Sequence, residues 1–168
     1  MASSPVVLAI LFLGVGAGAF IDLRTRRVPN ALTMTLAAIG IACAAAGFSE
    51  LTVGASLLGL ALGLGLMLPG YMFGATGAGD VKLLAAAGAL LGPANIGLAF
   101  LYTALAGGVL ALVVARRRRR LALTLEGTGR LVATGAANVP EIEHPAANNR
   151  FAYAPAIAVG CMLAGLEL

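Results

Sequence analysis

Long apolar runs separated by short polar or glycine-rich stretches dominate the chain. The runs are rich in Leu, Ala, Gly and Val, and they lack the alternation of apolar and polar residues that is typical of membrane β-strands. The pattern therefore predicts an all-α fold, a polytopic membrane bundle of six transmembrane helices. The expected helices span residues 5–21, 31–48, 51–68, 80–91, 96–115 and 151–166.

Composition supports the same fold class. Of the 168 residues, 60% are hydrophobic and 11% are charged, and the mean hydropathy is +0.98. A water-soluble core of this size cannot absorb so much apolar surface, which excludes a soluble globular protein. We expect a single membrane-embedded domain over residues 1–168, with a cytoplasmic loop at 116–150.

The fourth segment is short, about 18 Å long at 1.5 Å per residue against a hydrocarbon thickness of about 30 Å. If it crosses the membrane, all basic residues fall on one side, which the positive-inside rule makes cytoplasmic, and both termini lie outside. A re-entrant fourth segment would place a run of five arginines outside. Six crossings are therefore favoured. The basic residues are Arg24, Arg26, Arg27, Lys82, residues 116–120, Arg130 and Arg150.

The N-terminal segment contains Ala17-Gly18-Ala19, which resembles a signal-peptide cleavage site. It lacks a basic n-region and three arginines follow it, so we expect an uncleaved helix. The arginines at 116–120 adjoin a helix end without interleaved aromatic residues. This arrangement favours contact with anionic membrane lipid and not with nucleic acid.

Metal chemistry finds little support in the sequence. Cys43 and Cys161 each lie inside an apolar segment, and the chain has no paired CxxC motif. His144 has no neighbouring ligand residues. We expect buried, inert cysteines and neither a zinc module nor another metal site.

Two aspartates lie at the ends of apolar segments. Asp22 closes the first and Asp80 opens the fourth, after a glycine-rich turn. A carboxylate in a membrane costs about 2.5 to 3.5 kcal/mol on insertion scales, so each requires a chemical reason. The predicted topology places both at the cytoplasmic face, where a pair sharing one proton provides an acid and a base. Such a pair can activate water against a peptide carbonyl.

Simpler interpretations remain for each aspartate. Asp80 fits the N-cap of a helix, and Asp22 fits an interfacial ion pair with Arg24 or Arg26. Two other classes of protein would also use such a chain: a small ion-coupled transporter, and a non-enzymatic assembly protein. A transporter tends to place its carboxylates near the membrane midplane, and a scaffold has no reason to keep both.

Two stretches carry a resemblance to a known family. Residues 22–30, Asp-Leu-Arg-Thr-Arg-Arg-Val-Pro-Asn, and residues 77–83, Gly-Ala-Gly-Asp-Val-Lys-Leu, resemble the signature regions of prepilin peptidases, the type IV leader peptidase family of Gly-x-Gly-Asp aspartyl membrane proteases. Residues 151–160 are similar to the last-helix motif of that family. The small size resembles the short members that serve tight-adherence (Flp) pili.

The resemblance implies catalytic roles for Asp22 and Asp80. It implies site-shaping or substrate-binding roles for Gly77, Gly79, Lys82, Arg24, Pro29, Asn30, Tyr153 and Pro155. Family members cleave the basic leader from pilin-like precursors at the cytoplasmic face of the bacterial inner membrane, without a cofactor. The chain has no cysteine-rich domain, so the methyltransferase activity of larger members is not expected.

A precursor has a hydrophobic N-terminal helix that needs a docking surface on the bundle. Small residues permit close approach of helices in membranes. We expect the pair Gly63 and Gly65, or the pair Gly107 and Gly108, to provide it.

Overall fold

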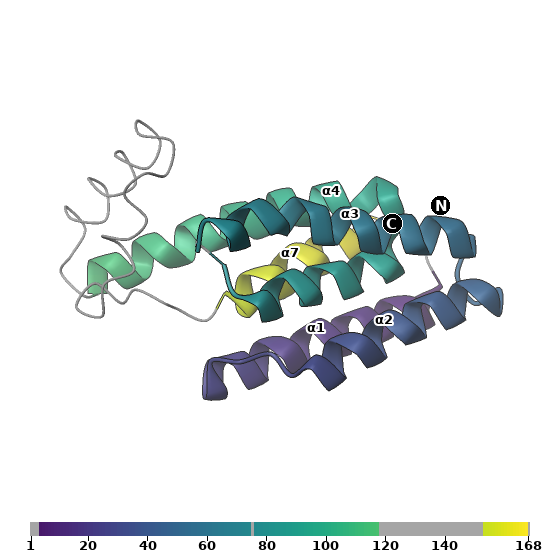
Figure 1. Cartoon of the computed structure of the whole chain (residues 1–168), viewed down its shortest axis with the longest axis horizontal. Coiled ribbons are helices and arrows are strands. Elements are labelled where there is room, and N and C mark those ends of the chain that lie inside the picture. Colours follow the sequence, from purple (N-terminus) through teal and green to yellow (C-terminus); the bar gives the residue numbers. More distant parts are fainter. Residues whose placement is uncertain (1–3, 75, 118–152, 168) are drawn as a thin grey trace.

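The computed structural model describes residues 4–74, 76–117 and 153–167, and this part of the chain is all-helical (Figure 1). The prediction of an all-α bundle is therefore confirmed. The helices are α1 (Pro5–Thr25), α2 (Asn30–Ala45), α3 (Val53–Met72), α4 (Ala78–Arg117) and α7 (Ala154–Leu166).

Helix α4 consists of two helices joined at a sharp reversal. Gly92 has φ 74° and ψ 177°, a left-handed conformation that favours glycine, and Pro93 follows it. The ribbon turns back there, so residues 78–91 and 93–117 run side by side in opposite directions (Figure 1). The described residues thus form helical units that match all six predicted segments in order.

Three of the described helices are long and apolar enough to cross a membrane: Pro5–Thr25, Val53–Met72 and Ala78–Val114, the last containing the reversal. Asn30–Ala45 and Ala154–Leu166 are shorter apolar helices. Six crossings with both termini outside stay a prediction. In Figure 1, α1 ends and α4 begins at one end of the bundle, whereas α1 begins and α7 ends at the other.

Helix α1 is longer than predicted. It continues one turn past Ile21 to Thr25, whose Oγ1 donates a hydrogen bond to the Ile21 carbonyl at 2.9 Å. Arg26 then takes a left-handed conformation with φ 55°, and its N–H donates to the Asp22 carbonyl at 2.8 Å. Polar residues extend a helix beyond its apolar run at the interface, where water can solvate them. Asp22 therefore lies inside the last turn of α1 and not after it.

Other helix boundaries also shift, and α2 is Asn30–Ala45 where residues 31–48 were expected. Helix α3 passes through Pro69 to Met72, and α4 continues as far as Arg117. The rest of the expected loop at 116–150, with His144, and the expected start of the last helix at Phe151 lie outside the described residues. Tyr153 directly precedes α7.

The first half of α4 forms the centre of the bundle. Every residue from 83 to 92 is buried. Glycines bring the neighbouring helices close to it, because a Cβ on them would meet α4 atoms. The contacts join Gly18 with Leu83, Gly40 with Ala89, Gly59 with Gly88, and Gly63 with Leu84.

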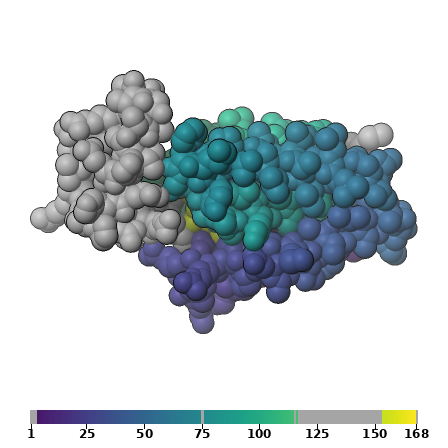
Figure 2. Space-filling view, in the orientation of Figure 1, coloured from purple at the N-terminus to yellow at the C-terminus, as the bar shows by residue number. Residues whose placement is uncertain are grey.

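Large apolar side chains cover the outside. Leu57, Leu58 and Leu62 of α3 are exposed, as are Leu101 and Leu105 of α4. Figure 2 shows α3 as one outer face of the molecule. In water such a surface would drive association, whereas in a membrane it meets lipid tails. The fold is that of a multi-pass membrane protein.

The expected docking glycines fall into two kinds. A Cβ on Gly63 would lie 2.7 Å from the Leu84 carbonyl oxygen, and one on Gly107 would lie 2.6 Å from Cε2 of Tyr153. Both glycines therefore pack inside the bundle, and the expectation that they receive another helix is wrong. Gly65 and Gly108 have open space where a Cβ would be.

Gly59→Ala should destabilise the bundle. The added Cβ would lie 2.9 Å from Cα of Gly92 and would overlap the Gly88 carbonyl, and overpacking of this kind costs about 1–3 kcal/mol. Gly65→Ala, in the same helix, is the matched control and should be neutral or slightly stabilising. Unfolding of both variants in the same detergent micelles measures the difference, and equal stabilities would contradict the packing described.

Candidate active site

Asp22 is a buried carboxylate held by the start of another helix. Its side chain is 6% exposed, and Oδ2 accepts a hydrogen bond from the Ala154 N–H at 3.2 Å. Ala154 is the first residue of α7, so its N–H has no acceptor within its own helix. The exposed amides of a helix N-terminus also favour a negative charge. The start of α7 therefore stabilises the Asp22 carboxylate.

Asp80 is the third residue of α4 and is 9% exposed. Its Oδ2 accepts a hydrogen bond from the Gly77 N–H at 3.0 Å, and its own N–H donates to the Gly77 carbonyl at 3.1 Å. A Cβ on Gly77 would lie 3.1 Å from Oδ2 of Asp80. Asp80 thus has the acidic role of a capping box at the third helical position, and Gly77, not Asp80, is the N-cap residue.

The two carboxylates are close enough for their charges to interact. Tyr153 lies beside them: burial raises the pKa of its phenol, and the negative charge of Asp80 raises that pKa further. The end of α1, the start of α4 and the start of α7 therefore meet at one point of the bundle. Two buried carboxylates that interact in this way can hold one proton between them and act as an acid and a base.

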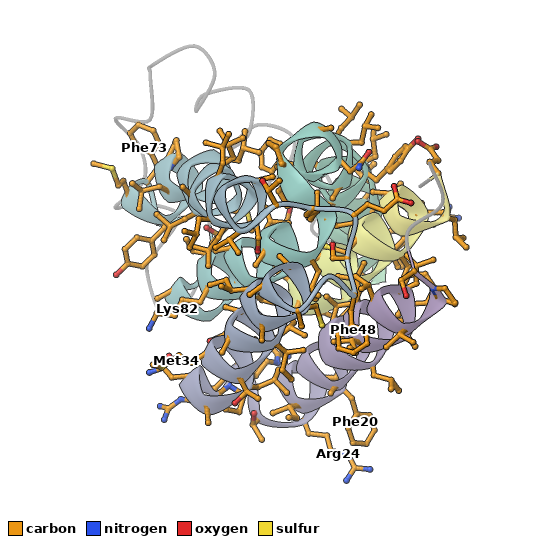
Figure 3. The ribbon with its side chains drawn as sticks, turned by 90° about the vertical axis from the view of Figure 1, so that its right-hand side faces the viewer. Phe20, Arg24, Met34, Phe48, Phe73 and Lys82 are labelled. Atoms are coloured by element: carbon orange, nitrogen blue, oxygen red, sulfur yellow. The ribbon has the colours of Figure 1, made fainter. Side chains whose placement is uncertain are left out.

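The turn between α1 and α2 docks on the first turn of α4. A Cβ on Gly79 would lie 3.0 Å from Cβ of Val28, so Gly79 lets this turn approach. Lys82 Nζ donates a hydrogen bond to Asn30 Oδ1 at 2.9 Å, and Figure 3 shows Lys82 pointing outward from the bundle. Pro29 is the N-cap residue of α2. The structure thus brings four of the expected site residues together beside Asp80.

Arg24 lies apart from this cluster. Its guanidinium carbon is 4.5 Å from the centroid of the Phe20 ring, and both side chains project from the outer side of α1 (Figure 3). A cation over an aromatic face is attracted by the ring quadrupole. The ion pair of Arg24 with Asp22 that the sequence suggested is therefore not formed.

Some contacts of the site escaped the sequence analysis. The Ala154 N–H joins Asp22 across 132 positions of the chain, and a backbone donor has no sequence signature of its own. The available signal was Pro155, the second residue of α7, because proline in the first turn marks a helix start. Within the described part of the chain, no three His, Cys, Asp or Glu side chains gather to hold a metal ion.

Comparison with known families gives one match. The sequence model of the type IV leader peptidase family matches residues 8–112. This range covers more than half of the chain and includes both Asp22 and Asp80. No curated protein and no solved structure matches the chain significantly.

The Lys82–Asn30 hydrogen bond can be measured with a double-mutant cycle. Lys82→Met and Asn30→Ala should show a coupling of about 0.5–1.5 kcal/mol in unfolding free energy, the net value of one hydrogen bond. Thr35, which is exposed on the same helix as Asn30, is the control partner, and Lys82→Met with Thr35→Ala should be additive. Additivity in both pairs would show that the bond does not hold the turn to α4.

Proposed function

The chain belongs to the type IV leader peptidase family, and on this premise we propose that it is a membrane aspartic endopeptidase whose catalytic residues are Asp22 and Asp80. Family membership makes it a protease of the prepilin leader type, and its apolar helices make it a multi-pass membrane protein. The observation that carries the proposal is the pair of buried carboxylates from α1 and α4, which interact at one end of the bundle.

The proposed reaction uses the two carboxylates as acid and base. The ionised member takes a proton from water while the oxygen of that water bonds to the scissile carbonyl carbon, and the protonated member gives its proton to the carbonyl oxygen. The tetrahedral intermediate then collapses: the C–N bond breaks, the amine nitrogen leaves with the proton of the dyad, and a hydroxyl of the intermediate returns its proton to the dyad as the new carboxyl group forms. One proton again remains on the pair. Neither a metal nor a cofactor takes part.

The proposed substrate is a pilin-like precursor with a hydrophobic helix and a short basic leader, cut after a glycine. The ends of the helices that carry Arg24, Lys82 and Arg116 lie at the same end of the bundle as the dyad (Figure 1). By the positive-inside rule this end faces the cytoplasm. We therefore assign the site to the cytoplasmic face of the bacterial inner membrane.

The position of the carboxylates argues against a transporter. Coupling-ion sites of transporters lie near the membrane midplane, often between repeated halves. Asp22 is in the last turn of α1 and Asp80 in the first turn of α4. A scaffold, in turn, gains nothing from two interacting buried carboxylates.

Asp22→Asn and Asp80→Asn should each abolish cleavage of a co-expressed pilin-like precursor. Loss of an acid or base costs about 100-fold or more in rate, which is visible as loss of the mobility shift and of the new N-terminus on sequencing. Glu50→Gln is the matched control, since Glu50 is exposed in the connection between α2 and α3, and it should cleave normally. Normal cleavage by either Asn variant, at equal membrane levels, would exclude the dyad.

A further inference from the structure

The start of α7 reaches both carboxylates through two adjacent residues. The Ala154 N–H binds Asp22 Oδ2 at 3.2 Å, and the phenol of Tyr153, the residue before it, is half-buried where it interacts with the charge of Asp80. A small displacement of this segment would therefore change the surroundings of both acids at once.

The ring of Tyr153 rests against Gly107 of α4. A Cβ on Gly107 would lie 2.6 Å from Cε2, 2.7 Å from the phenol oxygen and 2.8 Å from Cζ of Tyr153. The next residue, Gly108, has nothing within 4 Å of the corresponding position. The observed position of the ring is therefore compatible only with glycine at residue 107, whereas residue 108 has room for a side chain.

The body of α7 is held by other contacts. A Cβ on Gly160 would meet Thr103 of α4, and one on Gly165 would meet Leu11 and Phe12 of α1. These contacts lie about two to three turns beyond the helix start, and nearer the start Ala154 and Ile157 are buried in the apolar core. The contact between Tyr153 and Gly107 acts at the start itself.

We propose that Gly107 and Tyr153 are positioning residues. The Tyr153 ring packs against Gly107, and this contact holds the start of α7 in the position where the Ala154 N–H binds Asp22. This role rests on the proposed function, because it serves the dyad. Gly107 lies inside the matched family region, which ends at residue 112, whereas Tyr153 and α7 lie beyond it. Neither residue needs to touch the substrate.

Gly107→Ala and Gly108→Ala form a matched pair of variants. The alanine at 107 would push the ring away and displace the Ala154 N–H from Asp22, and misplacement of a catalytic group by about 1 Å costs up to about 100-fold in rate. We expect kcat for precursor cleavage in proteoliposomes to fall at least about tenfold for Gly107→Ala, with KM unchanged within about twofold. Gly108→Ala should keep the kcat of the parent, because nothing lies within 4 Å of the added Cβ. Equal kcat in the two variants would overturn the proposal.

Variants at Tyr153 distinguish packing of the ring against Gly107 from a direct role of the phenol hydroxyl in the reaction. Tyr153→Phe keeps the ring and should retain most of the activity, whereas Tyr153→Leu should lose kcat as Gly107→Ala does. The double variant Gly107→Ala/Tyr153→Leu should be no worse than Tyr153→Leu, because no ring remains to be displaced. Additive losses, or inactivity of Tyr153→Phe, would overturn the proposal.

A spectroscopic titration tests the contact between Tyr153 and Gly107 without a cleavage assay. The chain has three tyrosines, so Tyr71→Phe/Tyr102→Phe leaves Tyr153 as the only phenol. Burial and the Asp80 charge raise the pKa of Tyr153 above the ordinary value of about 10. In this background Gly107→Ala should lower that pKa and Gly108→Ala should not. If the parent protein cleaves no precursor, the proposed function fails. If the pKa of Tyr153 is unchanged in Gly107→Ala, the proposed positioning of the Tyr153 ring by Gly107 fails, whatever the outcome of the cleavage assay.

Discussion

Close contact between helices around the first half of α4 is the constraint on which the structure depends. Lipid tails are as apolar as the side chains, so burial of apolar surface does not drive helices together in a membrane, and tight packing has to do so. Gly18, Gly40, Gly59 and Gly63 let α1, α2 and α3 approach the segment 78–91. Asp80 lies at the start of this segment. The contacts that stabilise the bundle therefore also set the position of one carboxylate.

The free-energy cost of burying two carboxylates is partly offset by hydrogen bonds from backbone N–H groups at the starts of two helices. Asp80 accepts a hydrogen bond from Gly77 at the start of its own helix. Asp22 lies in the last turn of α1, where the helix dipole disfavours a negative charge. It receives its donor from α7 instead. Hydrogen bonds to charged groups are stronger than those between neutral groups, so each helix start compensates part of the desolvation of one carboxylate.

Much of this arrangement could be predicted from the sequence, because lipid leaves little freedom. Long apolar runs predict helices, and Asp22 and Asp80 stand out because charge in apolar surroundings is costly. The sequence could not separate Gly63 from Gly65, or Gly107 from Gly108, since these neighbours differ only in which side of the helix meets another element. The contacts with Ala154 and Val28 escaped it too, because they join distant segments through backbone or small apolar groups.

The hydrogen bond between Asp22 and Ala154 has a consequence for biogenesis. The chain is synthesised from its N-terminus, so both aspartates enter the membrane well before α7 exists. Until α7 docks against α1, Asp22 lacks its amide donor. Under the proposed function, the nascent chain thus carries both acidic side chains without an assembled site, and peptide hydrolysis would begin only when the last described helix has joined the bundle.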